Sequence, residues 1–268
     1  MDFGHSADGP RTKDGNQLID NSTAQGHGQR PRNAILGQLP AEEYEALAKF
    51  MVEVELPLNK ALSEPHEAIE YIFFLNHGLI STDAMTQSGE SVEVGVIGRE
   101  GFAGLPALLG QPQMSHAVVI QGEGSGLRVR SSVVRDLFLK GGVFQKLVHT
   151  FAYLQLTQTA QSVLCNRMHT VDQRLARWLL TSADRMESEE LHLTHEFLSH
   201  MLGVQRSTVT VAAGDLQRQE LIGYSRGRIH LLDRTRLVRT ACECYGIVTA
   251  AYDRLLKIDE NNGLRYLL

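Results

Sequence analysis

The sequence predicts an α+β fold made of an N-terminal β-roll, a long helix and a C-terminal winged helix-turn-helix. Three observations lead to this prediction. From residue 54 to 130, short apolar and β-branched runs alternate with turns rich in Gly, Asn and Ser, which is typical of barrels and rolls. Residues 143–166 contain neither Pro nor Gly and repeat apolar side chains at helical spacing. Residues 170–232 follow the order helix, turn, helix and hairpin.

The composition indicates a globular protein. The chain has 268 residues, of which 43% are hydrophobic and 21% charged, enough for two modest domains with ordinary cores. No apolar run approaches the roughly 20 residues that a membrane-spanning helix needs, and the N-terminal segment lacks the apolar core of a secretory signal. Three cysteines are too few for a disulfide scaffold. We therefore expect a cytoplasmic protein with no membrane partner.

The chain begins with a polar segment. Residues 1–33 are rich in Gly, Asp, Asn, Gln and Ser, so they predict a flexible tail that cannot bury enough surface to order itself. Residues 34–52 predict a helix, with Pro40 suited to its first turn. The expected domain boundaries are 34–142 for the roll, 143–166 for the long helix, 167–257 for the winged helix and 258–268 for a C-terminal tail.

The roll is expected to contain several short strands. Residues 71–75 and 79–86 flank a predicted turn at Asn76, His77 and Gly78. Ser88 and Gly89 predict a hairpin turn before a strand in which valines alternate over 92–96. Residues 116–121 and 127–130 predict two more strands, separated by a turn at Gly122, Gly124 and Gly126.

The long helix carries an apolar stripe, formed by Phe144, Leu147, Val148, Phe151 and Leu154. At more than 20 residues it exceeds the usual globular helix. The stripe can pack on its own roll or on a second copy of the chain. We favour the second copy, because glutamines at 155, 158 and 161 interrupt the central face and such side chains are tolerated in helix pairs, where they fix register. The expected assembly is a homodimer through this helix.

The helix-turn-helix is the most specific pattern. Thr170 and Gln173 form a capping box at the start of one helix, and Thr194 is the expected N-cap of the next. Gly203 supplies the positive φ that the tight turn needs, and residues 205–220 form the second helix. Its apolar face is Val209, Ala212, Ala213 and Leu216. The opposite face is small and polar, so it can approach base pairs closely.

A basic hairpin follows. The turn at 225–228 carries Arg226 and Arg228, which predicts a wing, and Asp233 is the expected N-cap of a single last helix that buries side chains up to Leu255. The net charge of the chain is −5, yet residues 203–239 hold seven arginines against three acidic residues. A basic stripe on an acidic protein is typical of phosphate contact. The residues predicted to contact DNA are Gln205, Arg206, Ser207, Thr208, Thr210, Val211, Arg218, Arg226 and Arg228.

Together these segments resemble the Crp/Fnr family of bacterial regulators over roughly residues 34–256. The resemblance is carried by YIFFLNHGLIS, by SVEVGVIGREGFAG and most specifically by LTHEFLSHMLGVQRSTVTVAAGDLQRQELIGYSRGRIHLLD. It implies a cyclic-nucleotide-binding-like jelly roll, a dimerising helix and homodimeric binding to an inverted repeat in double-stranded DNA, with RNA polymerase left open as a further partner. Arg206 occupies the place of a guanine-contacting arginine. Ser207 replaces a common base-contacting glutamate and Val211 a second arginine, so the resemblance implies a different operator.

The effector site departs further from the family. The resemblance places it at Gly104, Leu105, Met114 and Ser115, where cyclic-AMP-binding members have a glutamate after the glycine and an Arg-Ser pair. Without those charged partners a cyclic phosphate would be stripped of water with nothing in return. We expect that cyclic AMP is not the effector and that the effector is another ligand or absent.

The cysteines and histidines give little support for a metal site or an enzyme. Cys242 and Cys244 lie two apart on the predicted last helix and would not share a face, so a metal site there is not expected; Cys165 is a candidate redox residue or a packed thiol. The histidines show no HxH or HExxH spacing. No cofactor and no enzymatic activity are expected. The alternatives are a ligand-sensing module that regulates a protein partner, and a cupin-like β-roll enzyme, which needs a His-x-His and a Glu that the strands lack.

Overall fold

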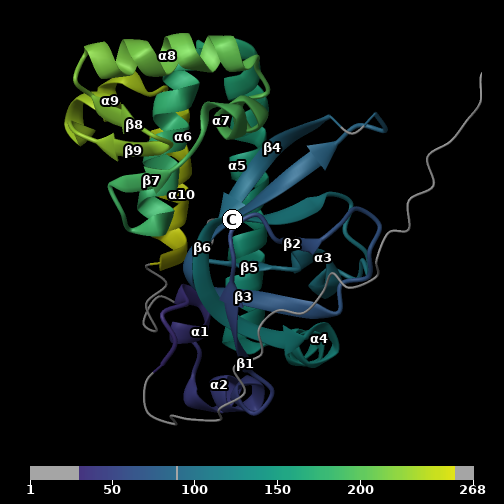
Figure 1. The fold of residues 1–268 in the computed structure, drawn as a ribbon. Coiled ribbons are helices and arrows are strands. Elements are labelled where there is room, and N and C mark those ends of the chain that lie inside the picture. The colour runs from purple at the N-terminus through teal and green to yellow at the C-terminus, as the bar shows by residue number, and fades with distance from the viewer. Residues whose placement is uncertain (1–29, 89, 257–268) are drawn as a thin grey trace, which may run out of the picture.

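The computed structural model describes residues 30–88 and 90–256. Two bodies lie one above the other, with a long helix, α5 (Gly142–Met168), running between them (Figure 1). The predicted class, a β-rich N-terminal part followed by a winged helix-turn-helix, is confirmed. None of the described helices is long and apolar enough to cross a membrane. The predicted tails at 1–29 and 258–268 fall outside the described residues.

The N-terminal body is an antiparallel roll in which β1, β6, β3 and β4 pair in that order, while β2 pairs with β6 and β5 with β3. Short helices cover its ends. Its elements are α1 (Ala34–Gly37), α2 (Ala41–Ala48), β1 (Val52–Leu56), β2 (Ala61–Ser63), β3 (Tyr71–Met85), β4 (Ser91–Ile97), β5 (Phe102–Ala103), α3 (Leu105–Leu108), β6 (Ala117–Arg130) and α4 (Ser131–Lys140).

The C-terminal body holds the winged helix. Its sheet has the order β7-β9-β8. Its elements are α6 (Val171–Met186), β7 (Glu190–His192), α7 (His195–Leu202), α8 (Arg206–Arg218), β8 (Ile222–Ser225), β9 (Arg228–Leu231) and α9 (Arg234–Thr240). The last helix, α10 (Cys244–Leu256), follows them in the chain. The sequence pattern did not single out β1, β2, β5, β7, α3 or α4.

The N-terminal helix differs from the prediction. Residues 34–52 form two short helices, with Pro40 as the N-cap of the second, and β1 already begins at Val52. Residues 30–33, expected in the tail, are placed, because Asn33 is fully buried and its side chain donates to the carbonyls of Leu75 and Gly101. This capping asparagine attaches the N-terminal segment to the roll.

The two glycine-rich segments predicted as turns lie inside continuous strands. β3 runs through Gly78 and β6 through Gly122 and Gly124, and the pairing between them shifts register around His77. A side chain at Gly78 would bring its Cβ within 2.9 Å of the Gly122 carbonyl oxygen, and one at Gly124 would overlap the backbone of His77. These glycines therefore allow two bulged strands to approach closely, whereas the sequence pattern suggested chain reversals.

The last helix is also divided. Asp233 caps α9 as predicted, accepting from the Arg236 amide. The helix then ends, because Ala241 is extended (φ −64°, ψ 156°), and α10 starts at Cys244. The chain turns back at this point, and Val248, Ala251 and Tyr252 join the core of the N-terminal body. The C-terminal helix thus packs with the roll and α5, although the sequence grouped it with the winged helix; Leu255 lies outside the side chains described.

Candidate nucleic-acid interface

Local capping positions the helix-turn-helix. The side chain of Thr194 accepts from the Phe197 amide at the start of α7, and Thr170 forms the predicted capping box with Gln173 at the start of α6. Gly203 ends α7 in the left-handed conformation (φ 59°). These features follow from short-range sequence, and all three predictions are confirmed.

Helix α8 lies across the end of the molecule opposite α2 (Figure 1). Its apolar face is buried as predicted: Val209, Ala212, Ala213 and Leu216 belong to the core shared with α6 and the wing strands. The outer face is exposed. Val211, at the centre of that face, has 64% of its surface accessible. A helix with one packed face and one small polar face can enter a groove of about its own width.

All nine residues predicted to contact DNA are exposed. Seven of them gather on α8 and its N-cap; these are Gln205, Arg206, Ser207, Thr208, Thr210, Val211 and Arg218. Arg206 is the first residue of α8, where backbone N–H groups without helical partners face outward. The Thr210 hydroxyl donates to the Arg206 carbonyl and lies 3.0 Å from His195 Nδ1.

His195 is a residue that the sequence analysis missed at this surface. Its ring stacks on Tyr224 of β8, with the centroids 4.4 Å apart. Burial, together with the nearby Arg206 guanidinium, lowers the pKa of His195. This stack connects the leading end of α8 to the wing, so both are presented on one side of the domain.

The wing arginines are not equivalent. Arg226 has a positive φ of 49° and Gly227 follows with φ 77°, which places both at the hairpin tip. Arg228 lies on β9, where its Nη1 is 3.4 Å from Glu190 Oε1. Arg218 pairs with Asp215 one turn earlier on α8. A phosphate would therefore meet Arg226 directly but would compete with a carboxylate for Arg218 and Arg228.

The apolar stripe of α5 that was predicted to form the dimer interface is buried within the chain itself. Phe144, Leu147, Val148, Phe151 and Leu154 are each at most 1% exposed and belong to the roll core of the same chain. The periodicity identified a buried face, but its assignment to a second copy is wrong because β-roll side chains already cover it. Gln158 is buried as well; its Nε2 donates to the Val96 carbonyl at 3.0 Å.

The opposite face of α5 is apolar and uncovered in the single chain. Its large side chains have 41–71% of their surface exposed; these are Tyr153, Leu156, Val163, Leu164 and Met168. At about 100° per residue these positions fall within an arc of about 140°, which puts them on one side of the helix. A contiguous apolar strip of this kind is a candidate contact for a second protein surface.

The roll contains a cavity of about 420 Å³. Of the four residues predicted for the effector site, Gly104 and Met114 line it, whereas Leu105 and Ser115 do not. Gly104 is left-handed (φ 105°) and caps α3. The lining also includes Glu67, Glu70 and Arg128. These charged groups thus come from segments outside residues 104–115, where the family resemblance placed the effector site.

Comparison with known proteins places the chain in context. Residues 173–240 match the family model of the Crp-like helix-turn-helix domain. No curated protein sequence matches the chain significantly. Among solved structures, a transcriptional regulator of the Crp/Fnr family from Eubacterium rectale is 14% identical, with a TM-score of 0.62, and the match covers 77% of this chain and 96% of that one.

Two further structures are similar. FixK2 from Bradyrhizobium japonicum is 17% identical, with a TM-score of 0.60, over 72% of this chain and 98% of its own. The c-di-GMP-responsive global regulator CLP of Xanthomonas campestris is 15% identical, with a TM-score of 0.60, over 72% of this chain and all of its own. The chain thus has a Crp-like helix-turn-helix domain within a fold that it shares with Crp/Fnr regulators, as the sequence resemblance implied.

Proposed function

We propose that the protein is a transcription regulator that binds double-stranded DNA through α8 and the wing. The observation that carries this proposal is the outer face of α8, which begins with Arg206 and is flanked by the hairpin tip at Arg226. Its side chains are small or long and basic, the combination that lets a helix approach base edges while arginines reach phosphates. Since such a target lies on the chromosome, we also propose that the protein works in the cytoplasm.

The protein acts as a homodimer on an inverted repeat. Support comes from the exposed strip of α5, which carries Leu156 and Val163 on the side away from the roll. A twofold pairing of α5 helices would cover the strip and present two α8 helices, and half-sites about one helical turn apart would then match them. The interface is thus proposed on the face opposite the one that sequence periodicity suggested.

Two other classes are weighed. A cupin-like enzyme would need His and carboxylate ligands gathered in the roll. Among the described residues, the potential metal ligands that converge are Cys165, His169, Cys242 and Cys244, and these lie outside the roll. A ligand-sensing module acting on a protein partner would leave the face of α8 without a role. We therefore retain a non-enzymatic DNA-binding regulator, and cyclic AMP independence stays a prediction.

The test is selection of bound fragments from genomic DNA, followed by gel shifts on the best site. Arg206→Ala is expected to weaken specific binding by about 1–3 kcal/mol and to relax one position of each half-site. Arg135→Ala, which removes an exposed arginine of α4 in the roll, is the matched control and should bind as wild type does. If wild type selects no DNA sequence, or Arg206→Ala keeps full affinity and selectivity, the proposal fails.

A further inference from the structure

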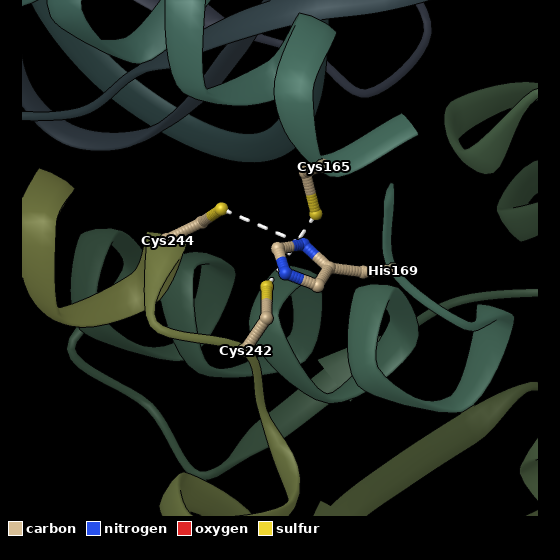
Figure 2. A group of neighbouring side chains, drawn as sticks. All are labelled: Cys165, His169, Cys242 and Cys244. Atoms are coloured by element: carbon tan, nitrogen blue, oxygen red, sulfur yellow. Dashed lines mark hydrogen bonds between the residues drawn. The ribbon is translucent and has the colours of Figure 1, made fainter. Parts of the chain in front are cut away.

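A second site lies at the junction of the two bodies. Cys165 near the end of α5, His169 just after it, and Cys242 and Cys244 at the α9–α10 connection converge there; their ligand atoms all lie within 4.8 Å of one another. Figure 2 shows the three sulfur atoms directed toward the imidazole of His169. The break between α9 and α10 makes this possible, because Cys242 precedes the helix and Cys244 begins it. The helical spacing that argued against a shared face does not apply.

We infer that these four residues form a Cys₃His site for a single Zn²⁺ ion, which connects the end of α5 to the α9–α10 connection. In a tetrahedral site with Zn–S bonds of about 2.3 Å, neighbouring ligand atoms are about 3.5–3.8 Å apart. The Sγ atoms of Cys165 and Cys242 are 3.5 Å apart. Cys244 Sγ is 3.7 Å from His169 Nδ1. Two edges of the tetrahedron thus already have the required length, and no open position remains for substrate, which is typical of a structural site.

The histidine is oriented as a ligand would be. Its Nδ1 faces the thiols, while its Nε2 lies 3.2 Å from Glu243 Oε1. In this orientation Nε2–H donates to the carboxylate, and the lone pair of Nδ1 is directed at the sulfur atoms. Metal-binding histidines are commonly held by such a carboxylate, which fixes the tautomer and raises the basicity of the ligating nitrogen. Packing of apolar thiols alone requires no such arrangement.

The surrounding charge fits a metal–thiolate centre. Arg174 and Arg177 of α6 are buried, with 7% and 9% of their surfaces exposed. Arg177 and Arg174 both lie near Cys165, and Arg174 also lies near Cys242. One Zn²⁺ with three thiolates and a neutral imidazole carries one net negative charge. Arg174 also donates to Asn166 Oδ1 at 2.8 Å, and a negatively charged centre beside two buried guanidinium groups is electrostatically favourable.

Ligand type points to zinc. Soft thiolates select Zn²⁺, Cu⁺ and iron–sulfur clusters, and a four-coordinate set of sulfur and nitrogen favours Zn²⁺. A disulfide between Cys165 and Cys242 is the competing use of this site. It would leave His169, Glu243 and Cys244 without a part in the chemistry, so the observations favour the metal.

The test begins with the full wild-type chain, purified under reducing conditions. We expect one zinc per chain by elemental analysis. After exchange for Co²⁺, we expect the visible absorption of a tetrahedral ion and near-ultraviolet sulfur-to-cobalt charge transfer. A chelator should accelerate alkylation of all three cysteines. The inference would be overturned if the chain contained no zinc, gave no tetrahedral cobalt spectrum and had cysteines whose alkylation rate did not change with a chelator. It would also be overturned if the intact mass of the metal-free protein were two hydrogens lower than expected, which would indicate a disulfide.

Variants then assign the ligands. Cys244→Ser and His169→Gln should each abolish stoichiometric binding of Co²⁺. Glu243→Gln, which keeps the ligands but removes the charge behind His169, should weaken metal binding by about 10- to 100-fold. His192→Gln, an exposed histidine of β7, is the control and should bind as wild type does. If Cys244→Ser does not fold, the cobalt spectrum and thiol protection of wild type decide the matter; unchanged metal affinity in a folded variant would refute the ligand set.

Discussion

Glu93 joins the roll to the winged helix through a contact whose strength should depend on pH. It lies on β4, and its carboxylate accepts from Trp178 Nε1 of α6 at 2.9 Å and from Gln121 Nε2 at 3.0 Å. Burial raises the pKa of Glu93 to about 8, and the neighbouring Asp83 raises it further, against the opposing effects of Gln121, Arg177 and Trp178. The folded protein therefore holds a proton here that the unfolded chain releases near pH 4.5.

The sign of the effect follows from linkage. A group whose pKa is higher in the folded state stabilises the fold fully below its unfolded pKa, and this contribution is lost as the pH rises through the folded pKa. For Glu93 the window runs from 4.5 to about 8. At about 1.36 kcal/mol for each pKa unit, the full difference corresponds to about 5 kcal/mol. We expect the free energy of unfolding to fall by about 2–5 kcal/mol across this pH window, because the side chain is half-buried and its ionised form can gain water.

The assay is urea unfolding between pH 5 and pH 9, followed by fluorescence of Trp178, the sole tryptophan in the chain. Glu93→Gln keeps the shape and removes the titration, so it should match wild type near pH 5 and exceed it at pH 9. Glu53→Gln, an exposed carboxylate on β1, should leave the pH profile unchanged. Parallel profiles for wild type and Glu93→Gln would show that this carboxyl does not control the contact.

Four further outcomes are expected. Leu156→Glu should convert the dimer to a monomer by light scattering and lower DNA affinity at least tenfold, whereas Leu139→Glu on the exposed side of α4 should do neither. Arg226→Gln should weaken binding to all DNA sequences and flatten the salt dependence of the DNA affinity by about one unit of slope. Arg228→Gln should have a smaller effect, because Arg228 is already paired with Glu190. Equal slopes for wild type and both variants would contradict phosphate contact. Gly101→Ala should cost about 1–3 kcal/mol, measured by urea unfolding, because an aromatic ring of α5 occupies the space its methyl group would need. Calorimetry should detect no micromolar binding of cyclic AMP, and tight binding that also strengthens DNA binding would overturn that prediction.

Short-range sequence determined the winged helix-turn-helix. Thr170, Thr194 and Asp233 cap helices within three residues of themselves, and Gly203 ends α7 because its turn requires a positive φ. The apolar period of α8 likewise separated its packed face from its exposed face. Such features depend on neighbours along the chain, so a single sequence suffices to identify them, and with them the predicted DNA-contacting surface.

Tertiary structure decided which surfaces meet. The period of α5 marks a buried face but carries no information about its partner, and the roll of the same chain covers it. Gly78 and Gly124 have the appearance of turn residues until two bulged strands are brought together, at which point the absence of a side chain becomes a packing requirement. Cys165 and Cys242 are 77 positions apart, and only the break between α9 and α10 brings both to His169. Contacts between distant segments depend on the path of the whole chain, which local pattern does not contain.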